Sequence, residues 1–170
     1  AGKGMQQLSA AGIETGTGLL EPEAMAINPG FIKRQHTGLP YVRCKLAMSL
    51  DGRTAMASGE SKWITGPAAR QDVQRLRARS SAIVTGIETV LADDPSMNVR
   101  LDDTEVVQPL RVVLDSSLRT PPDARMLGLE GKVMIVCCAA ADKGRQQALE
   151  QAGAEVLRQE GSGERVGLES

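Results

Sequence analysis

The stretch VMIVCCAAADKGRQQALEQAGAEVL (residues 133–157) indicates the fold of this chain most clearly. It opens with an apolar run at residues 133–136, and residues 143–152 then have the polar and apolar spacing of an amphipathic helix. Gly153 suits the positive φ that often ends a helix. A second apolar run follows at residues 154–157. Two apolar strands joined by a helix predict neighbouring parallel strands.

Further apolar runs extend this pattern toward the N-terminus. Strands are predicted at residues 82–85 and 110–114, with a helical turn at residues 88–92 between them. Because these strands are apolar throughout, we expect a mainly parallel sheet with helices on both faces. The predicted fold class is therefore α/β.

The part before residue 82 predicts one more strand and one more helix of this domain. Residues 42–48 alternate between apolar and other side chains, which favours a strand, and Asp51-Gly52 closes it with a turn. Thr65-Gly66-Pro67 is typical of a helix start, since threonine can cap free amides and proline fits the first turn. That helix is expected to run to about Ser80.

The two ends of the sequence are expected to lie outside this pattern. A helix from residue 4 is stopped by Gly12, and its position at the very start suggests a chain cut from something longer. Residues 21–35 predict a helix that Pro29-Gly30 interrupts, and it reads as a connector between domains. Residues 159–164 are expected to form a loop, and residues 166–170 an interrupted helix or strand.

Composition excludes several classes of function. The net charge of −1 and the 2% of aromatic residues argue against a nucleic-acid surface. No apolar run reaches the length of a membrane span and no signal region is recognisable, so we expect a cytoplasmic protein without a membrane partner. Cys44, Cys137 and Cys138 have no metal-ligand spacing and read as thiols. The sequence contains a single histidine, His36. We therefore expect neither a histidine-ligated metal site nor a Ser–His–Asp triad.

Four segments could carry chemistry, each with a structural alternative. In residues 49–63, small and hydroxylated residues allow close approach of a ligand and Trp63 offers a flat surface; a loop with a core-anchoring tryptophan explains them equally. Arginines of the helix at residues 65–80 could bind phosphate, with Arg77 favoured by its position, or could form a solvated face.

The other two segments follow predicted strands, where ligands bind in open α/β sheets. In residues 85–100, one carboxylate of Asp93-Asp94 could contact a sugar or relay a proton while Arg100 holds an anion; a turn before Pro95 is the alternative. Residues 114–117 could contact a nucleotide or form an Asx turn. Neither GxGxxG nor GxxxxGK[ST] occurs, so the common dinucleotide and phosphate fingerprints are absent from the sequence.

These segments, in this order, resemble the reductase domain of the bifunctional riboflavin-biosynthesis deaminase–reductase family. The similarity lies in KLAMSLDGRTA (45–55), SGESKWIT (58–65), VLADDP (90–95) with Arg100, and RVVLDS (111–116). GKGM (2–5) and AGIE (11–14) resemble the end of the family's deaminase domain. The resemblance divides the chain into a deaminase remnant (1–20), a connecting helix (21–39) and an incomplete reductase domain (40–170).

The resemblance implies a dihydrofolate-reductase-like fold and an NADPH-dependent enzyme. NADPH reduces the ribosyl group of 5-amino-6-(5-phosphoribosylamino)uracil to the ribitylamino product in that family. By resemblance, the cofactor contacts are Ala47, Trp63, Thr89, Asp93 and Ser116. The substrate contacts are Ser61, Arg77, Met97 and Arg100. Asp93 is the expected catalytic residue, either moving a proton or orienting the opened ribose.

The family's zinc deaminase motifs, His-x-Glu and Pro-Cys-x-x-Cys, do not occur in the sequence, so zinc belongs only to that absent domain. The reductase's C-terminal strands are missing as well. We therefore expect the 170 residues to bind NADPH weakly or not at all, and the full-length protein to form a homodimer. The alternatives are a reductase acting on the pyrimidine before deamination and a non-catalytic nucleotide-binding fragment.

Overall fold

The computed structural model describes residues 2–101, 105–160, 163 and 165–167. The chain forms two compact units, Ala1–Thr54 and Ala55–Ser170. The first contains three short helices, α1 (Lys3–Ala10), α2 (Glu21–Ile27) and α3 (Pro29–Thr37). The predicted helix that stops before Gly12 is confirmed, and so is the interruption at Pro29, which begins α3. None of the three helices has a buried residue.

The predicted strand at residues 42–48 is wrong, because these residues form no regular structure. A strand needs a partner to satisfy its backbone groups, and the sheet of the described residues contains only strands that begin at residue 82 or later. The apolar side chains of the segment stay in solvent, Val42 with 76% and Leu46 with 64% of its surface exposed. The turn after it is confirmed, since the amide of Gly52 donates to the carbonyl of Ser49.

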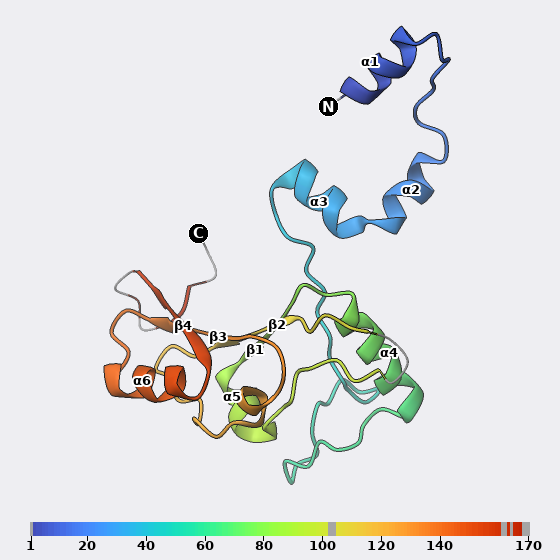
Figure 1. Ribbon diagram of the computed structural model, residues 1–170. Helices are drawn as coiled ribbons and strands as arrows, with labels where there is room; N and C mark the ends of the chain where they lie inside the picture. Colours follow the sequence, from blue (N-terminus) through green and yellow to red (C-terminus); the bar gives the residue numbers. More distant parts are fainter. Residues whose placement is uncertain (1, 102–104, 161–162, 164, 168–170) are drawn as a thin grey trace. The chain divides into compact units, whose positions relative to one another are not determined.

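The second unit is an α/β domain with a four-stranded sheet (Figure 1). All strand pairs are parallel and the order is β1-β2-β3-β4. The elements are α4 (Pro67–Ala78), β1 (Ala82–Gly86), α5 (Ile87–Asp93), β2 (Leu110–Leu114), the 3₁₀ helix η1 (Arg125–Gly128), β3 (Val133–Cys138), α6 (Lys143–Gln151) and β4 (Ala154–Gln159). The predicted parallel sheet and its strand–helix–strand unit are thus confirmed.

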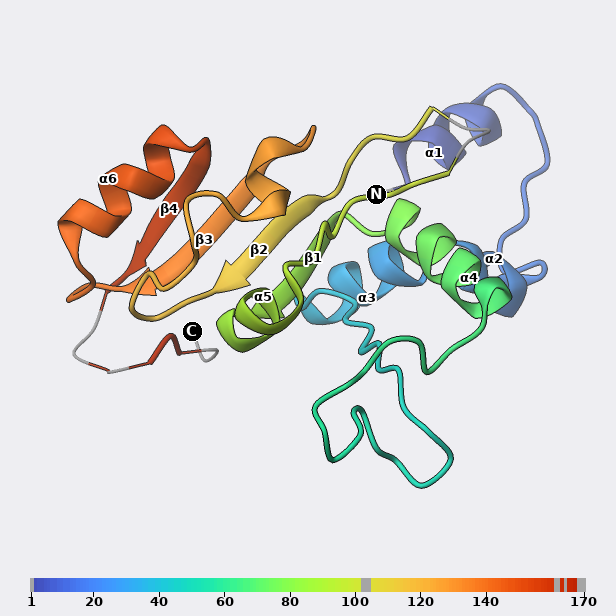
Figure 2. The same cartoon turned by 90° about the horizontal axis from the view of Figure 1, so that it is seen from below.

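One face of this sheet carries the core. Val113 of β2 lies beside Ile135 of β3, and both are fully buried. Val90 of α5 and Leu149 of α6 belong to the same buried cluster, so both crossover helices cover one face (Figure 2). We expected helices on both faces. The opposite face is also apolar, but Val84 and Leu157 expose 59% and 50% of their surfaces there.

The ends of two predicted elements differ in detail from the structure. Gly66, not Thr65, is the N-cap of α4, no side chain caps that helix, and Pro67 occupies its first turn. Asp142 caps α6 by accepting from the amide of Arg145. Residue 163 and residues 165–167 are neither helix nor strand. The other positions of the predicted C-terminal loop and final element (161, 162, 164 and 168–170) lie outside the described residues.

A buried arginine organises the connection between β2 and β3. Arg111 of β2 has no exposed surface, and its guanidinium donates to the carbonyls of Met126, Leu129, Glu130 and Gly131 at 2.7–3.1 Å. Burial lowers the pKa of this guanidinium. Gly131 has φ +101°, and a Cβ there would lie 2.8 Å from the Cβ of Gln108, so the turn requires glycine. The arginine gives the carbonyl of the buried Met126 its donor, and it ties the carbonyls of the more exposed residues 129–131 to β2.

Replacing Arg111 with methionine is expected to lower the free energy of unfolding by about 3 kcal/mol, because the buried carbonyl of Met126 and three partly buried carbonyls lose their donor. Arg119→Ala is the control: its ion pair with Glu88 is exposed, 44% and 78% for the two side chains, and such pairs contribute less than about 1 kcal/mol. Chemical denaturation of both variants measures the difference. Equal losses would contradict the role given to Arg111.

Candidate functional site

Two arginines converge on one asparagine in the second unit. The Nη1 of Arg77, on α4, donates to the carbonyl of Asn98 at 3.1 Å. The Nη1 of Arg100 donates to the side-chain oxygen of the same Asn98 at 2.9 Å. Burial first, and then the charge of Arg100, lower the pKa of Arg77. Two like charges held this close are stabilised by an anion between them, so the pair is a candidate phosphate site.

The loop that carries Arg100 turns sharply at two residues with positive φ, and glutamine side chains bond its backbone. Asp94 and Met97 have φ values of +41° and +51°, a conformation uncommon for residues other than glycine. Gln108 pairs with both backbone groups of Val99, at 2.9 and 3.1 Å. Gln74 of α4 accepts from the amide of Arg100 at 3.1 Å. These contacts fix the backbone on which the Arg100 side chain depends.

Met97 is 4% exposed and belongs to the core. Its buried side chain anchors the loop, so the predicted substrate contact at this position is left to its backbone. That assignment stays a prediction. Met97 lies one residue before Asn98, to which Arg77 and Arg100 both donate hydrogen bonds.

The adjacent carboxylates Asp93 and Asp94 have different surroundings. Asp94 accepts from the amide of Arg125 at 2.8 Å and so ties α5 to η1. Asp93 is exposed at the end of α5, and its carboxylate lies 4.0 Å from the ammonium of Lys62. Asp94 is therefore engaged by a hydrogen bond and an ion pair with Arg125, whereas Asp93 makes only the longer contact with Lys62. Thr89 lies one helical turn earlier on α5 and is also exposed.

The Lys62 contact brings the loop of Ser61 and Trp63 next to α5. Ser61 is half-buried, whereas Trp63 exposes 73% of its surface, so it is not a core anchor. The guanidinium of Arg70 lies over the Trp63 ring, 4.4 Å from its centre. An exposed indole with a supported face is suited to stacking against a flat ring.

Ser116 follows β2 at the carboxyl edge of the sheet. Its hydroxyl accepts from the amide of Val166 at 3.0 Å, and its carbonyl accepts from Cys138. The preceding Asp115 is fully buried and accepts from the amide and hydroxyl of Thr120, at 2.7 and 2.8 Å. The Asp115 carboxylate therefore bonds five residues on, not two, so the Asx-type turn predicted at residues 114–117 is wrong. A backbone hydrogen bond from Leu118 to Asp115 forms the turn there instead.

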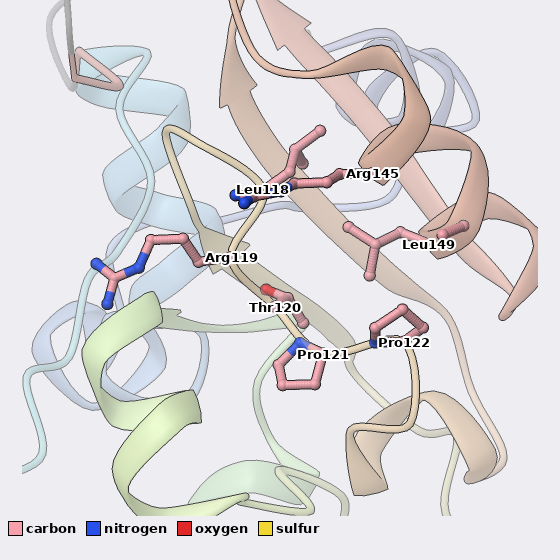
Figure 3. A pocket seen from close by; sticks show the side chains of 8 residues that line it. Leu118, Arg119, Thr120, Pro121, Pro122, Arg145 and Leu149 are labelled. Carbon is pink, nitrogen blue, oxygen red and sulfur yellow. The ribbon is translucent and has the colours of Figure 1, made fainter.

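Two further observations concern residues outside the segments above. Ala47 belongs to the first unit, whereas the other predicted site residues belong to the second, and its cofactor contact stays a prediction. A hollow of about 290 Å³ between α6 and residues 118–122 contains none of the predicted site residues. Figure 3 shows Leu149 facing it while Arg119 points away. It is an apolar groove, separate from the candidate site.

The sequence predicted no role for four residues that hold the site, namely Lys62, Gln74, Asn98 and Gln108. It offered Arg70 only as a possible phosphate ligand, whereas the structure places its guanidinium over Trp63. Asn98 and Lys62 lie inside segments that the sequence singled out, but glutamines that bind a distant backbone leave no local pattern. In the described ranges no helix is long and apolar enough to cross a membrane. The same described residues contain no group of three or more His, Cys, Asp or Glu side chains that could hold a metal ion.

The second unit is thus an α/β domain with a parallel sheet, in which two arginines converge on one asparagine. The chain belongs to the RibD C-terminal domain family, whose model matches residues 40–169. Its fold is the dihydrofolate-reductase-like fold of that family.

Named relatives agree with this assignment. The riboflavin biosynthesis protein RibD of Haemophilus influenzae is 52% identical over 153 residues, covering 84% of this chain and 41% of the relative. The RibD of Escherichia coli is 49% identical over 143 residues, or 78% and 39%. The chain therefore spans about two fifths of the length of these relatives.

Solved structures lead to the same family. Acinetobacter baumannii RibD has a TM-score of 0.82 at 50% identity, over 95% of this chain and 45% of that one. A deaminase/5-amino-6-(5-phosphoribosylamino)uracil reductase from Thermotoga maritima has a TM-score of 0.74 at 29% identity, over 95% and 50%.

Inorganic phosphate is expected to raise the midpoint of thermal unfolding by about 2 °C at concentrations well above its Kd, because it binds the folded arginine pair. Arg100→Ala should abolish the rise, whereas Arg75→Ala should retain it, since Arg75 is exposed on the same helix as Arg77. Differential scanning fluorimetry at constant ionic strength measures both. A rise that survives Arg100→Ala would show that phosphate binds elsewhere.

Proposed function

We propose that the protein containing this chain is an NADPH-dependent reductase of 5-amino-6-(5-phosphoribosylamino)uracil in riboflavin biosynthesis. The observation that carries this proposal is the convergence of Arg77 and Arg100 on Asn98, close in the chain to the exposed Asp93. Such a pair suits the substrate's phosphate. The relatives support it by name, because they are riboflavin biosynthesis proteins and one solved relative is described as this reductase.

The residues of this chain have distinct roles in the proposal. Arg77 and Arg100 bind the 5′-phosphate, and the Met97 backbone and Ser61 complete the substrate contacts. Holding the phosphate orients the sugar, which is where proximity contributes to the rate. Asp93 hydrogen-bonds the ribose and passes a proton to its ring oxygen as the bond between that oxygen and C1 breaks, so that the oxygen becomes a hydroxyl of the opened sugar. Lys62, 4.0 Å away, stabilises the Asp93 carboxylate after that transfer.

The proposal assigns the binding of NADPH to an indole, two hydroxyls and a carboxylate of the second unit and to Ala47. NADPH supplies the hydride when bound. The exposed Trp63 indole provides a surface for one of its rings, and the hydroxyls of Thr89 and Ser116 suit its ribose or phosphate groups. Asp93 contributes a carboxylate to the cofactor side as well, and Ala47 a contact from the first unit. Zinc has no part in this half of the bifunctional protein.

The remaining parts of the proposal concern the whole protein. Residues 1–20 are assigned to the end of a deaminase domain, residues 21–39 to a connecting helix and residues 40–170 to the reductase. A cytoplasmic homodimer is proposed, with neither nucleic acid nor membrane as a partner.

Asp93→Asn is expected to lower the kcat of the full-length reductase about a hundredfold, as loss of a general acid or base does. Asp72→Asn, exposed on α4, is the matched control and should leave kcat unchanged. NADPH oxidation at 340 nm measures both. A kcat within twofold of wild type for Asp93→Asn would exclude a catalytic role and favour a non-catalytic nucleotide-binding module.

Substrate choice is tested by presenting the aminouracil and the diaminopyrimidine that precedes deamination. The proposal predicts that kcat/KM is at least about tenfold higher for the aminouracil than for the diaminopyrimidine, because one pair of hydrogen bonds to the substrate contributes about that factor. The reverse preference would identify a reductase that acts before deamination.

A further inference from the structure

Trp63 lies in a segment that has little structure of its own. Residues 55–66 contain turns but neither helix nor strand. A turn closes the tip, where Met56 donates to Glu60 and Gly59 donates to Met56. The Trp63 side chain is 73% exposed. An indole in such a segment is free to take several orientations, and ordering it when a ligand binds costs conformational entropy.

Arg70 connects this indole to the regular part of the fold. It belongs to α4 and is half-buried. Its guanidinium lies over the Trp63 ring at 4.4 Å from the centre, while its Nη1 donates to the carbonyl of Thr65 at 2.6 Å. One side chain therefore holds the loop twice, through the ring of Trp63 and through the backbone two residues later.

These contacts distinguish Arg70 from the other arginines of α4. Arg77 donates to a loop carbonyl beside Arg100, where an anion is favoured. Arg75 and Arg79 are exposed. The guanidinium of Arg70 is already used by an aromatic face and a carbonyl. It is therefore not placed as a phosphate ligand, although the sequence allowed that interpretation.

We propose that Arg70 is a positioning residue for the dinucleotide cofactor: it fixes the indole of Trp63 so that the ring's free face is preformed for a flat ring of NADPH. The inference rests on the proposed function, because it takes NADPH as the ligand of Trp63. Arg70 itself does not touch the cofactor or the reacting atoms. It lowers the cost of binding by holding the indole before the cofactor arrives.

The first test uses the 170-residue chain, in which Trp63 is the single tryptophan. Arg70→Ala is expected to lower the steady-state fluorescence anisotropy of Trp63 and to raise its acrylamide quenching constant, because the indole gains freedom. Arg70→Lys, which keeps the charge but not the planar stack, should fall between. Arg75→Ala is the matched control on α4 and should match wild type. Far-ultraviolet circular dichroism confirms that each variant is folded.

The second test uses the full-length reductase. Arg70→Ala is expected to raise KM for NADPH about fivefold, the factor that an exposed cation–π contact contributes, and to leave kcat and KM for the uracil substrate within twofold. A merely structural loss would lower kcat and change both KM values. That pattern, or an unchanged KM for NADPH, overturns the proposal.

The two tests separate this inference from the proposed function. Unchanged anisotropy and quenching in Arg70→Ala would overturn the positioning role even if the protein is an NADPH reductase. A wild-type protein that neither binds nor oxidises NADPH would overturn the proposed function, and with it the cofactor as the ligand of Trp63.

Discussion

The structure depends most on the anchoring of β2, the strand that lies between β1 and β3. At its first end, the buried guanidinium of Arg111 holds four carbonyls of the crossover to β3. Just after its other end, the buried carboxylate of Asp115 holds the amide and hydroxyl of Thr120. Buried charges are costly unless they are hydrogen-bonded, so both are tolerated only because the chain folds back onto them. Through them β2 sets where the connecting loops run.

The candidate site lies around the end of α5. A left-handed Asp94 ends that helix, and Met97 turns the chain again before Asn98. The buried Met97 side chain, with the amides of Gln74 and Gln108, holds the turn. The result places Arg100 close enough to Arg77 to lower its pKa. This like-charge arrangement costs stability in the free protein, and an anion relieves it, as is common at functional sites.

Much of this could be predicted from the sequence, because the informative patterns are local. Apolar runs set the positions of β1 to β4, and Gly153 marks the end of α6. Residues 42–48 carry an equally good strand pattern but form no strand, because strand formation depends on a partner that periodicity does not supply. The apolar character of the strands also predicted helices on both faces of the sheet. In the structure, α5 and α6 pack against one face.

For the site, the sequence singled out Trp63, Arg77, Asp93 and Arg100 but could not say how they are held. Asp93 and Asp94 are equivalent in the sequence; only the folded chain turns one toward Arg125 and the other toward Lys62. An arginine often stacks on a tryptophan, but the sequence does not say which arginine stacks on Trp63, nor that Gln108 pairs with Val99. Such contacts depend on tertiary geometry.

The central claim is that Arg77 and Arg100 bind the substrate's phosphate, and a double-mutant cycle between enzyme and substrate tests it most directly. The kcat/KM of wild type and Arg100→Ala is measured with the phosphorylated aminouracil and with its dephosphorylated form. Each single change is expected to lower kcat/KM roughly tenfold to a hundredfold. If the arginine binds the phosphate, the second change adds little once the first is made. Losses that multiply would contradict the account.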